Sequence, residues 1–116
     1  MLKKTERTQE RYMKAGAEMR LFKTLGSKLV CDISCVLSAP DQDMMLRALD
    51  KIDLVCGRAE DNMFRDHPKL SDQYLDVFYG STDSEPRNEV DAEMILRARE
   101  VSDELFERKG HREEAR

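Results

Sequence analysis

The 116-residue chain is long enough for one domain with a core of ordinary size. It is 38% charged and 40% hydrophobic with only five glycines and three prolines, which favours long helices over a sheet, and its pI near 5.3 would repel a polyanion from most of the surface. No run of about 18 apolar residues is present to span a membrane, and no apolar stretch follows the basic N-terminus, so we expect no secretory signal and a cytoplasmic protein.

Apolar residues recur at steps of three and four from about Thr5 to Leu37, which predicts a first long helix. Its stripe contains Tyr12, Ala15, Met19, Phe22, Gly26, Leu29, Ile33 and Val36. Gly26 is the weak point, because a glycine inside a helix costs roughly 1 kcal/mol relative to alanine. The stripe stays in phase across it, so we favour one continuous helix over a stop and a new cap at Gly26-Ser27.

A second helix is predicted from Ser38 to about Arg65. Ser38 can cap the free backbone N–H groups, Pro40 suits the first turn, and Asp41 favours the positive end of the helix dipole. The apolar stripe then contains Met45, Leu49, Ile52, Cys56, Ala59 and Met63. The segment Asp66-His67-Pro68 disfavours continuation.

Two further helices are predicted in the C-terminal half. A short one covers about Leu70 to Phe78, with Gly80 as its stop, and residues 81–86 are loop-like. The last runs from about Arg87 to Lys109, with Gly110 as its end. Its apolar stripe is Met94, Ala98, Val101 and Leu105, and Phe106 lies beside it. We expect residues 111–116 to be a frayed tail.

These elements predict an all-α fold: a small up-and-down helical bundle of three long helices plus one short helix, in a single domain over residues 1–110. The first helix is the longest, so residues 1–14 are expected to overhang as a basic arm that carries Tyr12 and Met13. Two explanations stay open: a second copy covers this overhang in a homodimer, or the N-terminus is frayed.

Charge is unevenly distributed along the chain, whose net charge is −4. Residues 1–30 hold eight basic and three acidic side chains, and residues 31–95 hold six and fifteen. The spacing predicts a basic stripe along one face of the first helix, formed by Lys4, Arg7, Arg11 and Lys14. Such a stripe can follow a phosphate backbone, dock on an acidic protein surface, or simply be solvated. No aromatic residues alternate with these cations as stacking platforms for bases.

Histidine and cysteine patterns give little support to catalysis or metal binding. His67 lies in a predicted turn and His111 in the tail, and neither has a nucleophile at a recognisable spacing. Cys31, Cys35 and Cys56 lack the Cys-x2-Cys spacing of zinc sites. We interpret them as free thiols packed in the core, in a reducing compartment.

Paired carboxylates raise a third alternative, a magnesium-dependent all-α nucleotide hydrolase. Glu89 and Glu93 lie four residues apart on the last helix, and Asp50 and Asp53 lie three apart on the second. Solvated helix faces explain these acids without further assumptions. We therefore expect no enzyme, no cofactor and no metal ion.

An aromatic cluster before Gly80 is the candidate partner-binding site. It consists of Tyr74, Phe78 and Tyr79, and tyrosine is favoured at interface hot spots. The same side chains can instead plug one end of the bundle. The sequence thus predicts a small non-enzymatic regulatory or adaptor protein acting through helix-mediated contacts with a protein partner, itself included. The alternative is a nucleic-acid-associated regulator that uses the basic stripe.

Overall fold

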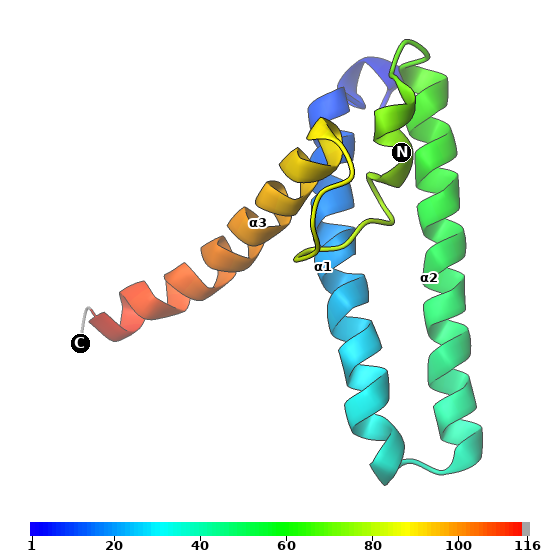
Figure 1. The fold of residues 1–116 in the computed structure, drawn as a ribbon, viewed down its shortest axis with the longest axis vertical. Coiled ribbons are helices and arrows are strands. Elements are labelled where there is room, and N and C mark those ends of the chain that lie inside the picture. The colour runs from blue at the N-terminus through cyan, green and yellow to red at the C-terminus, as the bar shows by residue number, and fades with distance from the viewer. Residues whose placement is uncertain (115–116) are drawn as a thin grey trace.

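The computed structural model describes the backbone of residues 1–114 and the side chains of residues 1–105, and this part of the chain is all-α. Three helices dominate it: α1 (Gln9–Ile33), α2 (Ala39–Asp66) and α3 (Glu89–Glu114). Three 3-10 turns accompany them: η1 (Lys4–Glu6), η2 (Ser34–Val36) and η3 (Asp72–Asp76). α1 and α2 form a long antiparallel hairpin, and α3 crosses α1 obliquely (Figure 1). None of the described helices is long and apolar enough to cross a membrane.

The first predicted helix is confirmed as one piece, with different ends. Its N-cap is Thr8, whose hydroxyl accepts a hydrogen bond from the Arg11 amide at 3.2 Å, and η1 lies before it. The helix continues through Gly26, which is buried. A Cβ there would lie 2.9 Å from a Leu49 methyl group, so the glycine lets α1 and α2 approach closely.

The second helix is confirmed almost residue for residue. Ser38 caps α2 by accepting from the Asp41 amide, and Pro40 lies in the first turn. The helix ends at Asp66, before His67-Pro68. Every member of its predicted apolar stripe is buried or half-buried, including Cys56 and Met63, which are completely enclosed.

The predicted short third helix is wrong in kind, since η3 is a 3-10 turn. Its hydrogen bonds join residues three apart in the chain, such as the bond from the Tyr74 amide to the Ser71 carbonyl at 3.1 Å. The predicted stop at Gly110 is also wrong, because α3 continues to Glu114. A glycine ends a helix when it takes a left-handed conformation, and no described glycine has a positive φ. The last two residues of the expected tail, and the side chain of Phe106, lie outside the described part.

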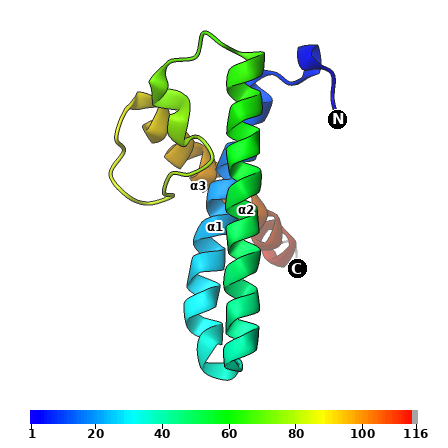
Figure 2. The same ribbon diagram turned by 90° about the vertical axis from the view of Figure 1, so that its right-hand side faces the viewer.

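The core occupies one half of the hairpin, which we call the proximal half: the N-terminal part of α1 and the C-terminal part of α2. η3, the loop after it and the start of α3 cover this half. The buried apolar side chains that pack together there are Met13, Ala17, Cys56, Met63, Val77, Phe78, Met94 and Ala98. The distal half, near η2, consists of α1 and α2 alone (Figures 1 and 2).

The expected up-and-down bundle is therefore only partly correct. α3 packs on α1 and η3 at its start and then diverges from the hairpin, so it does not run alongside the other helices (Figure 1). The expected overhang of residues 1–14 is also wrong. The Tyr12 hydroxyl donates to Asp66 at the end of α2 at 2.5 Å, and Met13 is 3% exposed, so this chain covers both residues itself.

The predicted α1 stripe divides between two faces. Gly26 is buried and Tyr12, Met19 and Ile33 are half-buried, whereas Ala15, Phe22 and Leu29 are exposed. The face that packs on α3 and η3 carries Met13, Gly16, Ala17 and Arg20. A helix with neighbours on two sides buries more than one stripe, and periodicity alone does not tell which stripe is left uncovered.

Candidate functional site

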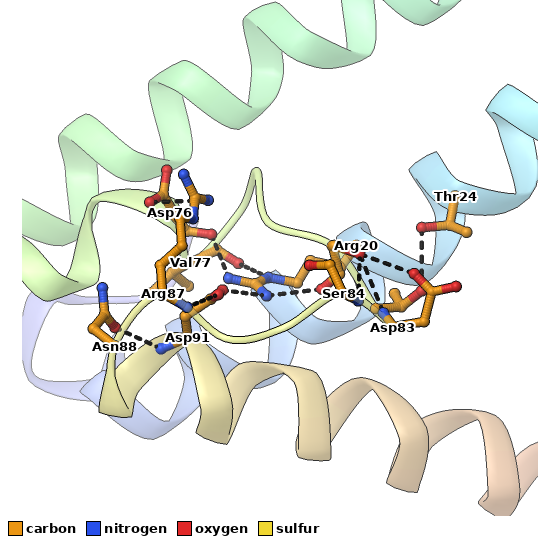
Figure 3. A network of polar contacts seen from close by, with 11 residues as sticks. Arg20, Thr24, Asp76, Val77, Asp83, Ser84, Arg87, Asn88 and Asp91 are labelled. Atoms are coloured by element: carbon orange, nitrogen blue, oxygen red, sulfur yellow. Dashed lines mark hydrogen bonds and ion pairs between the residues drawn. The ribbon is translucent and has the colours of Figure 1, made fainter.

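A buried arginine holds the covering layer on the hairpin. Arg20 of α1 is 1% exposed and donates to three backbone carbonyls: Val77 at 3.1 Å, Asp76 at 2.6 Å and Ser81 at 2.9 Å. Its Nη1 lies 2.9 Å from Oδ1 of Asp91 in the first turn of α3. Figure 3 shows Arg20 at the centre of this network. One guanidinium thus connects α1, the end of η3, the following loop and α3.

Asp91 is positioned by its own helix start. The Asn88 side chain accepts from the Asp91 amide at 2.8 Å, and Asp91 accepts from the Arg87 amide at 3.0 Å. Burial would raise the pKa of Asp91, but the Arg87 amide and Arg20 outweigh it and lower that pKa. Burial lowers the pKa of Arg20, against the opposing effect of Asp91. Arg20 and Asp91 interact with each other and with backbone groups, so we interpret this network as structural.

Arg20 is not among the site residues predicted from the sequence. A signal was present, because Met13, Gly16, Ala17 and Arg20 share one helix face and two of them are small. Small residues mark a close approach of backbones, and a Cβ on Gly16 would lie 2.8 Å from the Val77 carbonyl oxygen. A buried arginine is tolerated at such a site only when its donors find acceptors. Here the acceptors include a loop about 60 residues away in sequence.

A second polar cluster fixes the N-terminal segment to the end of α2. Arg7 pairs with Asp66 at 2.6 Å, Tyr12 donates to the same carboxylate, and His67 Nε2 lies 2.8 Å from the Arg7 carbonyl oxygen. The hydrogen bonds from Arg7 and Tyr12 hold the pKa of Asp66 well below its usual range. His67 is therefore engaged with backbone and the edge of the Tyr12 ring.

The predicted basic stripe does not form one helix face, because the chain changes direction between η1 and Thr8. Arg7 faces Asp66, while Lys4, Arg11 and Lys14 are exposed. Three of the four still come together around a cleft of about 410 Å³. Its lining residues are Leu2, Arg7, Arg11, Tyr12, Lys14, Ala15 and Glu18.

The aromatic cluster is divided by burial. Phe78 is 3% exposed in the core, so it is not available to a partner. Tyr74 is half-buried and its hydroxyl accepts from the Gln9 side chain at 2.8 Å. Tyr79 is exposed but lies under the Lys23 ammonium, 4.7 Å from the ring centroid. The alternative interpretation, a plug over the core, fits Phe78.

The cysteines and acid pairs do not converge. Cys56 is a core residue as predicted, but Cys31 and Cys35 are exposed at the distal tip, beyond the core. Asp53 pairs with Lys23 and Glu93 with Arg97, which neutralises one acid of each predicted pair. Within the described residues, no three His, Cys, Asp or Glu side chains are grouped to hold a metal ion.

Exposed apolar side chains gather instead on the outer side of α1. A groove of about 430 Å³ separates α1 from the diverging part of α3; Glu18, Leu21, Phe22, Leu25, Val101, Ser102 and Leu105 line it. A shallower cleft of about 510 Å³ lies between α1 and α2; Ala15, Glu18, Met19, Phe22 and Ile52 line it. The two share Glu18 and Phe22, so they form one continuous surface.

This surface is the candidate functional site, and we call its two parts the α1–α3 groove and the open face of the hairpin. Phe22 is 53% and Leu25 65% exposed, so two large apolar side chains one helical turn apart are open to solvent on this surface. No protein-family model, no curated protein and no solved structure matches this chain.

Proposed function

We propose that this chain is a small, non-enzymatic regulatory or adaptor protein that acts by binding other proteins through its helices. The observation that supports this proposal is the continuous apolar surface around Phe22, formed by the α1–α3 groove and the open face. Contiguous exposed apolar surface rimmed by polar residues is typical of protein-binding sites.

The shape of the groove favours a helical ligand. Two helices that diverge from a common crossing leave a trough between them, and an amphipathic helix places residues spaced three and four apart into such a trough. Among the described residues of the lining, Glu18 is the one charged side chain. A ligand helix with an apolar stripe and a basic residue beside Glu18 would complement the groove.

Site-specific photo-crosslinking tests the proposal. A benzophenone amino acid replaces Phe22, and the full chain is irradiated in the cells that express it. The expected result is a covalent adduct to a defined protein, because a 53% exposed residue in a binding groove lies against the ligand. Leu96, 57% exposed on α3 outside both clefts, is the matched control position and is expected to give no adduct. Equal labelling at both positions, or none at Phe22, would contradict a binding role.

A second candidate function is nucleic-acid binding by the N-terminal cleft. The observation that favours it is the convergence of Arg7, Arg11 and Lys14 on one concave surface. Lys4 adds a fourth exposed or half-exposed cation at the same end of the molecule. The pairing of Arg7 with Asp66 weakens this candidate, because it removes one positive charge from the cleft.

Fluorescence anisotropy with labelled duplex DNA and single-stranded RNA separates this candidate from the first. If several cations contact phosphates, affinity falls steeply between about 50 and 200 mM salt, through counterion release. Arg11→Glu with Lys14→Glu is expected to abolish that binding, whereas Phe22→Glu leaves it unchanged. If neither nucleic acid binds at low salt, this second candidate function is ruled out.

A further inference from the structure

The open face of the hairpin extends beyond the cleft that marks it. On α1, Leu29 lies two turns after Phe22, in line with Ala15 and Phe22. On α2, Ala48 lies four residues before Ile52 and Val55 three after it, so both share the side of the helix that Ile52 presents to the cleft. All of these flanking residues are exposed, and Val55 is 54% exposed. Two adjacent antiparallel helices therefore carry apolar rows on one face.

The two rows are matched in height along the hairpin. Gly26 of α1 lies beside Leu49 of α2, and Lys23 pairs with Asp53. These two pairs show which residues of the two antiparallel helices lie at the same height along the hairpin. Phe22 then lies level with the space between Ile52 and Val55, and Leu29 lies level with the region of Ala48. Glu18 lies level with Arg58.

We propose that the open face is covered by a second copy of this chain, packed about a two-fold axis that runs along the hairpin. The inference rests on the proposed function, in which this face is a protein-binding surface. Each α1 then faces the partner's α2 in the opposite direction, and the two hairpins form an antiparallel four-helix bundle. Phe22 enters between the partner's Ile52 and the partner's Val55.

Charge complementarity favours a second copy as the occupant. Glu18 and Arg58 are both exposed, and neither forms an ion pair in the described part of the chain. The two-fold axis brings Glu18 of each copy opposite the partner's Arg58, so one chain supplies both halves of two equivalent contacts.

The diverging helix α3 supports the same arrangement. A second α2 lying over α1 also borders the α1–α3 groove, because groove and open face share Glu18 and Phe22. α3 runs obliquely away from the hairpin (Figure 1), and the α1–α3 groove that it borders is open to the helix of another copy.

The size of the face sets the expected strength. From Ala15 to Leu29 it extends about 20 Å at 1.5 Å per residue, and two packed helices make it about 20 Å wide. Such an area, about 800 Å² over both copies, is typical of weak interfaces, so we expect self-association no tighter than micromolar.

Sedimentation velocity of the full chain from about 1 to 200 μM tests the association. We expect a monomer at the lowest concentration and a dimer at the highest. Phe22→Glu and Val55→Glu are each expected to weaken dimerisation about tenfold or more, since each buries a carboxylate against an apolar partner. Leu96→Glu, a change of similar exposure on α3, should leave the dimer intact. Circular dichroism verifies that all three variants remain folded.

A charge-reversal experiment tests the specific arrangement. Glu18→Arg and Arg58→Glu should each weaken self-association several-fold, because like charges then meet at both contacts. A mixture of the two variants should associate as strongly as the wild type, since each contact again joins opposite charges. If either substitution acted only by disturbing the folded monomer, mixing the two variants would not restore association.

The outcomes separate this inference from the proposed function. A wild-type monomer at about 200 μM, or a mixture that fails to associate, overturns the two-fold dimer. Crosslinking at position 22 to a different protein would then leave the adaptor function standing alone. Crosslinking to a second copy of this chain, together with the rescue, supports both.

Discussion

Arg20 connects three elements because its guanidinium has five N–H donors in a rigid plane. Its acceptors are the backbone carbonyls of residues 76, 77 and 81, and the Asp91 carboxylate forms an ion pair with it. Gly80 is required beside it, since a Cβ at that position would lie 2.3 Å from the guanidinium carbon. A buried charge with satisfied donors is tolerated, whereas the loss of one partner leaves the others uncompensated.

Replacing Arg20 by methionine is therefore expected to destabilise the fold by about 3–5 kcal/mol, because Asp91 is left buried without its counter-charge. Urea unfolding followed by circular dichroism measures the loss. Lys28→Met is the control, since the Lys28–Asp32 pair is exposed and should contribute less than about 1 kcal/mol. Equal effects of the two substitutions would show that the buried network does not hold the covering layer.

Asp66 gives the fold a defined response to acid. Its pKa is lowered by Arg7 and Tyr12, so the unfolded chain binds a proton at a higher pH than the folded chain does. The stabilisation is complete above the unfolded pKa of about 4 and is lost as pH falls from there toward the folded pKa.

Asp66→Asn should accordingly be less stable than the wild type at pH 7, and the difference should shrink as pH falls below about 4. Denaturant titrations of both proteins across this range provide the measurement. A difference that is constant with pH would mean that Asp66 contributes shape and hydrogen bonding but no charge.

At the scale of elements, the helix ends follow local chemistry. Thr8, Ser38 and Asn88 cap α1, α2 and α3 with short polar side chains, and of these the sequence analysis predicts Ser38. The helical spacing of Leu70, Tyr74 and Phe78 predicts a helix, but this segment forms the 3-10 turn η3. Its backbone is instead shaped by Arg20, which takes the carbonyls of Asp76 and Val77.

The approach of α1 to η3 depends on Gly16. A Cβ there would lie 2.5 Å from a Val77 methyl group and 2.8 Å from the Val77 carbonyl oxygen, and backbone cannot move aside as a flexible side chain does. Gly16→Ala should therefore cost roughly 1–2 kcal/mol in the free energy of unfolding, despite the better helix propensity of alanine.

Gly57→Ala is the matched control for Gly16→Ala. Its nearest neighbour would be the tip of the Tyr79 side chain at 3.0 Å, which can shift. Helix propensity should then dominate, with an outcome between no change and a gain of about 1 kcal/mol. If both alanines stabilise the protein, the close contact at Gly16 is not tight in solution.

At the scale of the whole molecule, the two halves of the hairpin differ in cover. η3 and the start of α3 cover the proximal half, whereas the distal half consists of α1 and α2 alone (Figures 1 and 2). Backbone hydrogen bonds in thinly packed regions open more easily, so the distal half should be the less stable part of the fold.

Hydrogen exchange should detect this difference in local stability between the two halves. It should also show the difference becoming smaller when a second copy covers the open face. In dilute solution, amides of residues 22–50 are expected to exchange faster than those of residues 52–63. At high concentration the amides of residues 22–29 and 48–50, which lie in the open face, should slow, while the first turn of α3 near Asp91 stays unchanged. Exchange that is independent of concentration would argue against contact along the open face.

The sequence by itself determined the helices: their number in the hairpin, the continuity of α1 through Gly26 and the limits of α2, because periodicity and capping are local. The protein-binding role stays a prediction. Only the tertiary structure decided which stripe of α1 is left exposed, that Phe78 is core, and that α3 diverges. These outcomes depend on Arg20, whose acceptors lie about 60 residues away, and no local pattern encodes how distant segments share one buried charge.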